Sequence, residues 1–149
     1  MPRGRRWGSD LPSPHIWLTL GYRGVRQGDG ESVIEWDATP EYCFHAPSGP
    51  IVHGGMVTTL LDTAMGGACW STLDDDESFL TADLRVEFMR SARPGTLRAD
   101  GRVVQRNRRV AFCSADLFDG RDAARVRPLH PDHPPRLTAT QAAARPAYE

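Results

Sequence analysis

Lysine is absent from the sequence, and the 18 basic residues are therefore all arginine. They are balanced by 19 acidic residues, so the formal net charge at pH 7 is −1. A chain so nearly neutral lacks the overall positive field that attracts nucleic acids, and we predict no nucleic-acid partner. Arginine does bind phosphate groups well, because its planar guanidinium offers paired hydrogen-bond donors.

Cysteine is scarce, and long apolar runs are missing. The three cysteines, Cys43, Cys69 and Cys113, are odd in number and widely spaced. This pattern matches neither a disulfide framework nor a zinc site, so we expect a reducing cytoplasm and no metal or other cofactor. No run approaches the roughly 18 apolar residues of a membrane span, and no apolar leader segment follows the arginine-rich start. We therefore predict a cytoplasmic protein without a membrane partner.

The chain is long enough for one domain with a substantial core, and its composition divides it into three parts. Residues 1–15 hold proline, glycine, serine and arginine and are predicted to form a flexible arm. Residues 16–120 form the domain. Residues 121–149 are rich in arginine, proline and alanine without an apolar period, which predicts an irregular or disordered tail. A final strand at 123–129 is doubtful, because a proline interrupts it.

Turn residues divide the first third of the domain. A Gly-Asp-Gly turn at 28–30 separates two short segments, 22–27 and 32–37, and predicts a β-hairpin. Residues 39–52 contain three prolines and are predicted to be loop. Residues 16–20 fit either a short helix or a strand.

Residues 54–70 have the apolar period of an α-helix. At about 100° per residue, one stripe holds Val57, Leu60, Leu61, Ala64 and Ala68. A neighbouring face carries Thr58, Asp62, Met65 and Cys69. That second face is too apolar for open solvent yet includes a carboxylate, so it predicts either a pocket wall or a subunit contact.

Three strands are predicted after the helix. Residues 80–89 alternate between apolar and polar side chains, which is the period of a half-buried strand. Two further strands, 96–105 and 110–119, are separated by an arginine-rich turn at 106–109. A hairpin, one long helix and then antiparallel strands predict an α+β fold with the helix on one face of the sheet.

The chemistry is concentrated at the start of the long helix, where His53 is followed by Gly54 and Gly55. A glycine turn at a helix start exposes N–H groups that can stabilise a developing negative charge. Asp62 lies further along the same helix, and a carboxylate there can act as base or nucleophile. Together they suggest acyl transfer or hydrolysis. The alternative for Asp62 is an ordinary hydrogen-bonded residue on the helix surface.

This helix motif, with the strand that follows it, resembles the hotdog-fold thioesterases, and within them the PaaI-like acyl-CoA thioesterases. The resemblance runs from about Gly21 to Asp119; its core is 53–55 followed by 61–64, and residues 81–88 resemble the next strand of the family. It implies an antiparallel sheet wrapped around one central helix. It also implies a homodimer or homotetramer, in which the glycine and the acidic residue of one active site come from different chains.

The resemblance also implies roles for individual residues in the hydrolysis of acyl-CoA to a carboxylic acid and free coenzyme A. The N–H of Gly54 would polarise the thioester carbonyl, with Gly55 part of the same substrate-binding turn. Asp62 would be nucleophile or general base. Thr81 would help to place the attacking water, although it fits an ordinary strand threonine too. His53 is either catalytic or, as we favour, a residue that orients the turn.

Four arginines are candidates for binding the phosphates of coenzyme A: Arg106, Arg108 and Arg109 on the predicted turn, and Arg90. The alternative for all of them is a solvated surface. One departure from the family pattern is Pro47, which stands where the family often has Asn or Gln near the thioester. This departure keeps a second function open, that of an acyl-CoA-binding hotdog protein without catalytic activity. A third alternative is an inactive structural dimer.

Overall fold

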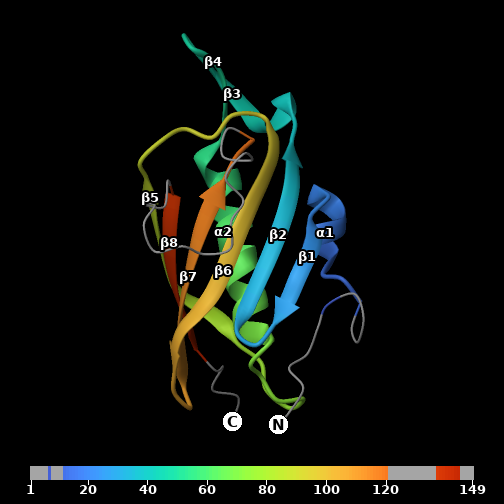
Figure 1. Ribbon diagram of the computed structural model, residues 1–149, viewed down its shortest axis with the longest axis vertical. Coiled ribbons are helices and arrows are strands. Elements are labelled where there is room, and N and C mark those ends of the chain that lie inside the picture. Colours follow the sequence, from blue (N-terminus) through green and yellow to red (C-terminus); the bar gives the residue numbers. More distant parts are fainter. Residues whose placement is uncertain (1–6, 8–11, 121–136, 145–149) are drawn as a thin grey trace.

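The computed structural model describes Trp7, residues 12–120 and the strand at residues 137–144. Two α-helices, one short 3-10 helix and eight strands follow one another along these residues (Figure 1). In chain order they are α1 (His15–Leu20), β1 (Arg23–Gly28), β2 (Glu31–Ala38), η1 (Pro40–Tyr42), β3 (Cys43–Ala46), β4 (Gly49–Val52), α2 (Gly54–Trp70), β5 (Leu80–Phe88), β6 (Gly95–Arg106), β7 (Val110–Phe118) and β8 (Leu137–Ala144).

Six of these strands form one antiparallel sheet in the order β1-β2-β6-β7-β8-β5, and α2 lies along one face of it (Figure 1). The order makes β1 and β5 the two edges of the sheet. β3 and β4 pair separately as a small hairpin that projects at the end of the molecule where α2 begins. The arrangement is the α+β fold that the sequence predicts.

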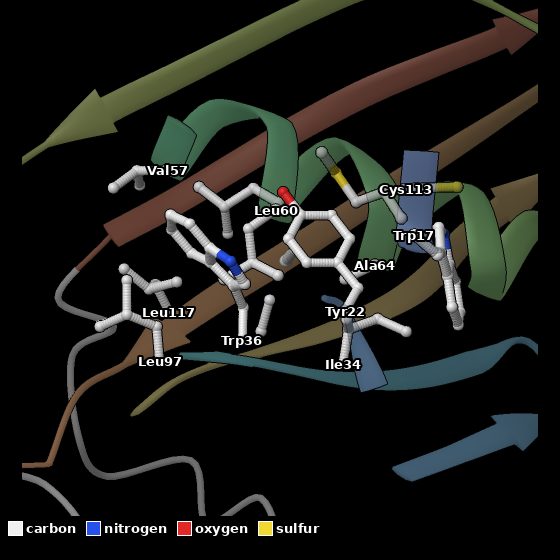
Figure 2. Close-up of a cluster of buried hydrophobic side chains, with 14 of the residues drawn as sticks. Trp17, Tyr22, Ile34, Trp36, Val57, Leu60, Ala64, Leu97, Cys113 and Leu117 are labelled. Atoms are coloured by element: carbon white, nitrogen blue, oxygen red, sulfur yellow. The ribbon is translucent and has the colours of Figure 1, made fainter. Parts of the chain in front are cut away.

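The core lies between α2 and the inner face of the sheet (Figure 2). The apolar stripe of α2 is fully buried there, with Leu60, Leu61 and Ala64 at 0 % exposure. Trp36 of β2 and Leu97 of β6 meet it from the sheet. Burying a large apolar side chain contributes roughly 1.5–3 kcal/mol, so this stripe holds α2 on the sheet.

α2 approaches the sheet most closely at Gly101 of β6. A Cβ atom at Gly101 would lie 2.4 Å from the carbonyl oxygen of Ala64, a distance that real Cβ atoms do not adopt. Only glycine at this position therefore allows α2 to pack so closely against β6. Asp62 is two residues before Ala64, so the close contact also fixes the position of its carboxylate relative to the sheet.

Several predicted elements are confirmed, and one segment is not. The helix at residues 54–70 has the predicted bounds, and the hairpin is present as β1 and β2. The prediction that residues 39–52 are loop is wrong, because they hold η1, β3 and β4. Pro50 is tolerated in β4 because a strand in a two-stranded hairpin has an open side where no N–H is needed.

The two ends of the chain also differ from the prediction where they are described. The segment 121–149, predicted to be irregular, contains β8, which pairs with both β7 and β5 and completes the sheet. The doubtful strand at 123–129 lies outside the described residues. Within the predicted flexible arm, the ring of Trp7 stacks on Trp70 at 5.7 Å and meets Trp17 edge-on at 5.1 Å. Large aromatic surfaces lose water in such contacts, which fixes this residue.

Candidate active site

The start of α2 is organised by His53, which is its N-cap. The Nδ1 atom of His53 accepts a hydrogen bond from the N–H of Gly55 at 3.0 Å, and its carbonyl oxygen accepts from Met56 and Val57. Because Nδ1 is an acceptor in this bond, the imidazole proton is assigned to Nε2. The structure thus gives His53 the orienting position that we favoured.

The N–H of Gly54 is the remaining donor at this helix start. Within the described part of the chain it has no hydrogen-bond partner, as expected for the first N–H of a helix. Gly54 is half-buried, and a Cβ atom there would touch the ring of Phe88 at 3.4 Å. The unpaired donor therefore lies beside an aromatic side chain from β5, a neighbour that sequence reasoning missed. The only sequence signal for it is the alternation in 80–89.

Asp62 and Thr81 lie together although they are 19 positions apart. The Thr81 hydroxyl donates to Oδ1 of Asp62 at 3.1 Å, joining the middle of α2 to the start of β5. The pairing of β5 with β8 shifts its register between Thr81 and Asp83, a bulge of the kind that re-aims a side chain. Asp62 is half-buried and Thr81 is exposed, so the carboxylate is both held by the protein and open to a ligand.

The electric field of Asp62 also reaches the core. The pKa of Tyr22 is raised well above its ordinary value, first by burial and then by the nearby Tyr42 and Asp62. A carboxylate opposes the formation of a second negative charge beside it. Tyr22 therefore stays neutral, with its ring against Trp36 at 5.9 Å.

Gly54 and Asp62 do not converge within one chain. They are eight residues apart, which is about two helical turns and roughly 12 Å along the axis. β5 runs past both, with Phe88 beside Gly54 and Thr81 beside Asp62. Gly54 and Asp62, the two parts of the predicted site, therefore both lie beside β5, but near opposite ends of this strand.

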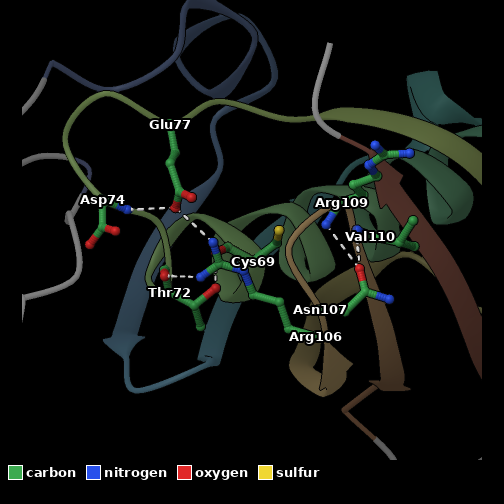
Figure 3. A network of polar contacts seen from close by, with 8 residues as sticks. All are labelled: Cys69, Thr72, Asp74, Glu77, Arg106, Asn107, Arg109 and Val110. Atoms are coloured by element: carbon green, nitrogen blue, oxygen red, sulfur yellow. Dashed lines mark hydrogen bonds and ion pairs between the residues drawn. The ribbon is translucent and has the colours of Figure 1, made fainter. Parts of the chain in front are cut away.

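The arginine-rich turn lies at the other end of α2. Arg106 forms an ion pair with Glu77 at 2.6 Å and donates to the carbonyl of Thr72, just beyond the helix (Figure 3). Glu77 also accepts from the N–H of Asp74 at 2.9 Å. Arg106 therefore connects the end of β6 to the loop that follows α2. Its partner Glu77 was not predicted from the sequence, in which residues 74–77 are a run of four acidic residues.

Arg108 and Arg109 remain exposed on this turn. The side chain of Asn107 shapes it by accepting from the N–H groups of Arg109 and Val110, at 2.9 and 2.8 Å (Figure 3). Both arginines line a shallow recess together with Ser78 and Phe79. Both arginines are thus exposed beside a small hollow at the surface.

Arg90 and Pro47, the remaining candidates, lie on other segments of the chain. Arg90 forms an ion pair with the buried carboxylate of Asp119 at 3.3 Å, linking the segment after β5 to the end of β7. Pro47 is exposed at the turn between β3 and β4. Arg93 holds this turn by donating to the carbonyl of Ser48 at 2.8 Å. No set of three metal-ligating side chains is found in the described residues, and none of their helices is long and apolar enough to cross a bilayer.

A sheet wrapped around one helix, with a glycine helix start and a carboxylate beside the edge strand, defines a hotdog-fold protein. The chain belongs to the thioesterase superfamily, whose family model matches residues 49–124. That span holds the whole of α2 and strands β4 to β7. The predicted relationship to the PaaI-like thioesterases is confirmed.

Individual relatives agree with this assignment. A protein of Halobacterium salinarum that is provisionally named an esterase is 34 % identical over 111 residues, covering 73 % of each chain. A second provisional esterase, from Pseudomonas aeruginosa, is 35 % identical over 77 residues, 51 % of this chain and 58 % of its own. These relatives support a role as a hydrolase.

Solved structures show the same fold. A phenylacetic acid degradation-related protein of Ralstonia eutropha, provisionally described as a thioesterase, has a TM-score of 0.72 and 28 % identity, covering 91 % of this chain and 93 % of its own. The PaaI protein of Escherichia coli also gives a TM-score of 0.72, at 17 % identity over 90 % of this chain and 86 % of its own. At that lower identity the likeness concerns the fold alone.

Proposed function

We propose that the protein is an acyl-CoA thioesterase, which hydrolyses acyl-CoA to a carboxylic acid and free coenzyme A. The observation that carries this proposal is the hydrogen bond from Thr81 to Asp62, in a chain of the thioesterase superfamily. A carboxylate held by a hydroxyl can bind and orient a water molecule for attack on a carbonyl carbon. No metal or other cofactor is needed for this reaction.

The site is composed of two chains. The Gly54 N–H of one chain faces the thioester carbonyl oxygen and stabilises the negative charge that develops on it. Asp62 and Thr81 come from the other chain, because 12 Å along one helix is too far for both groups to reach one carbonyl. The two copies join along β5, where Leu80, Phe88 and Met89 are 59, 54 and 62 % exposed at the sheet edge. A dimer is the minimum assembly, and a tetramer is compatible with it.

In the general-base route, Asp62 takes a proton from a water molecule as that water attacks the thioester carbon. The tetrahedral intermediate then expels the coenzyme A thiolate, which receives the proton. In the nucleophilic route, Asp62 attacks directly and forms an acyl anhydride that water hydrolyses afterwards. A single turnover in ¹⁸O-labelled water tests for the nucleophilic route, because water that attacks the aspartyl carbonyl of the anhydride leaves ¹⁸O in the Asp62 carboxylate, whereas the general-base route labels only the released acid.

Coenzyme A is bound through its phosphates by the arginine-rich turn. Arg108 and Arg109 are the main candidates because both are exposed over the recess. Arg106 and Arg90 contribute less, since each is engaged by an acidic side chain. Paired guanidinium donors suit phosphate oxygens, which supports a nucleotide at this turn. The three free cysteines fit a location in the reducing cytoplasm.

The test is release of free thiol from a panel of short, long and aromatic acyl-CoA substrates. We expect hydrolysis of at least one of them, well above the uncatalysed rate. If no thiol is released but acyl-CoA raises the unfolding temperature, the protein is an acyl-CoA-binding protein instead. The exposed Pro47, which lacks a side-chain amide, is the observation that favours this second function.

A further inference from the structure

Two buried thiols lie outside the proposed mechanism. Cys69 on α2 and Cys113 on β7 are free cysteines with 1 and 2 % exposure. Cys113 is on the inner face of β7 in the core cluster (Figure 2), and Cys69 borders the Arg106 network (Figure 3). The two thiols are neighbours across the boundary between helix and sheet, since each is the largest influence on the pKa of the other.

The close seat of α2 explains why these thiols meet. Gly101 brings the backbone of β6 against the backbone of α2 at Ala64, and Ala115 of β7 is the register partner of Gly101. Cys69 is a little more than one helical turn beyond Ala64, and Cys113 is the next inward residue before Ala115. The glycine contact thus brings the segments that carry Cys69 and Cys113 close to each other.

The surroundings make the two thiols chemically unequal. The neighbouring Cys113 thiol and the Arg106 guanidinium lower the pKa of Cys69. The Cys69 thiol, together with burial, raises the pKa of Cys113. The thiolate is the reactive form of cysteine, which favours Cys69 as the attacking sulfur.

Cys69 is the thiol nearer to the protein surface. It is among the residues that line the recess at the arginine-rich turn, with Phe79, Arg106 and Ala111. Cys113 is not among the residues that line this recess. A small reagent that enters the recess would therefore meet Cys69 before Cys113.

We propose that Cys69 and Cys113 are an oxidation site, which a small hydroperoxide such as hydrogen peroxide converts to a disulfide. The Cys69 thiolate attacks one peroxide oxygen, the O–O bond breaks, and the released hydroxide takes a proton to become water. The resulting sulfenic acid is attacked by the Cys113 sulfur, which loses its proton and displaces a second water. Two thiols and one peroxide thus give one disulfide and two waters.

The disulfide would tie α2 to β7. It closes a loop of about 44 residues between positions 69 and 113, which removes conformational freedom from the unfolded chain. From loop length we expect the unfolding temperature to rise by roughly 5–15 °C. Formation of this disulfide does not depend on thioesterase activity.

The experiment uses the full chain with Cys43→Ser, which removes the more accessible third thiol. After a few equivalents of hydrogen peroxide, we expect a mass loss of two hydrogens, a peptide linking Cys69 to Cys113, and the higher unfolding temperature. Dithiothreitol should reverse all three changes. In Cys113→Ala, dimedone should label Cys69 as a sulfenic acid, whereas Cys69→Ala should form neither the linkage nor the adduct.

If a variant folds poorly, the wild-type chain still answers the question, because the peptide that links Cys69 to Cys113 can be mapped in the wild-type protein directly. Recovery of Cys69 and Cys113 as reduced thiols, after peroxide has fully oxidised Cys43, would overturn the proposal. Labelling of Cys113 rather than Cys69 by dimedone would overturn the assigned order of attack. A linkage that forms without any rise in unfolding temperature would overturn its proposed effect on α2.

Discussion

The two edges of the six-stranded sheet are built differently. β1 carries charged side chains that pair with β2: Arg23 bonds to Asp37 at 2.7 Å, and Arg26 to Glu31 at 2.9 Å. Its register shifts between Gly24 and Arg26, and Trp17 of α1 packs over Gly24. Charges, a bulge and a covering helix are all ways in which proteins prevent an edge strand from pairing with another chain.

β5 also has a register shift and an exposed ion pair, Arg85 with Glu87, but large apolar side chains are exposed at its two ends. Leu80 and Phe88, at its two ends, are more than half exposed, as is Met89 just beyond it. Both halves of the proposed site lie along this strand, with Thr81 by Asp62 and Phe88 by Gly54. We infer that β1, the closed edge, resists pairing with another chain, and we propose that a second copy joins at β5, the open edge, to complete the site.

The largest effect is expected at the open edge, from Asp62→Asn. This substitution keeps the shape of the side chain but removes the base or nucleophile, so turnover should fall roughly 10²–10⁴-fold. Steady-state thiol release measures it, and light scattering should show an unchanged assembly. Turnover at the wild-type rate would remove Asp62 from the mechanism and favour the binding protein.

A matched pair of substitutions tests the two edges directly. Leu80→Lys places a charge on the apolar edge, while Val25→Lys places one at a similarly exposed site on β1, at 55 % against 59 %. Only Leu80→Lys removes a leucine that the proposed dimer would bury, so only this substitution should weaken dimerisation, roughly 10–100-fold. Sedimentation at several concentrations reports this difference. Equal weakening by both substitutions would contradict the assignment of β5 as the subunit contact.

A smaller effect is expected at the arginine-rich turn. Replacing Arg108 and Arg109 together with alanine should raise the KM for acyl-CoA about 3–30-fold, because phosphate contacts are lost. The KM for the corresponding acyl-pantetheine, which lacks the nucleotide, should stay the same. Arg26→Ala, an exposed arginine on β1, serves as the control. A parallel loss with both substrates would mean that the turn acts on folding rather than on the nucleotide.

The smallest effect is expected at the closed edge, from Asp37→Asn. The Arg23 guanidinium, followed by the Thr96 hydroxyl, lowers the pKa of Asp37 in the folded protein. Its contribution is therefore present at neutral pH and is lost as the pH falls through the folded-state pKa. Because the pair is exposed, the unfolding temperature should drop by less than about 3 °C at pH 7. The difference from wild type should shrink as the pH falls through the folded-state pKa; a difference that persists once Asp37 is protonated would exclude the ion pair as its cause.

The fold was predictable where the local pattern was strong. The glycine start and apolar stripe predicted α2, and alternation predicted β5. β8 was missed because its sequence, Leu-Thr-Ala-Thr-Gln-Ala-Ala-Ala, has little β-propensity, so pairing with β5 and β7 must hold it in place. β3 and β4 were missed because prolines and a glycine mark turns, and only the small separate hairpin accommodates them.

The candidate site was predictable as residue types but not as geometry. The motif around Gly54 and Asp62 pointed to the chemistry, and the capping role of His53 followed from its place before the helix. The bond between Thr81 and Asp62 depends on how β5 lies along α2, which is a tertiary property. The ion pair between Arg106 and Glu77 likewise depends on how the loop after α2 packs. The sequence shows a run of acidic residues and a run of arginines, but not which residue of one pairs with which residue of the other.

The central claim is that one active site takes Gly54 from one chain and the Asp62–Thr81 pair from another. Gly54→Pro removes the N–H while fitting the first turn of a helix, so this variant and Asp62→Asn should each be nearly inactive. Mixed and allowed to exchange subunits, they form heterodimers in which one of two sites is intact.

The most direct measurement is thiol release from this mixture after subunit exchange. With random pairing, half of the dimers are mixed, so activity should recover to about a quarter of the wild-type value. Activity that stays at the sum of the two inactive variants, although mass spectrometry shows that heterodimers have formed, would contradict a site shared between chains.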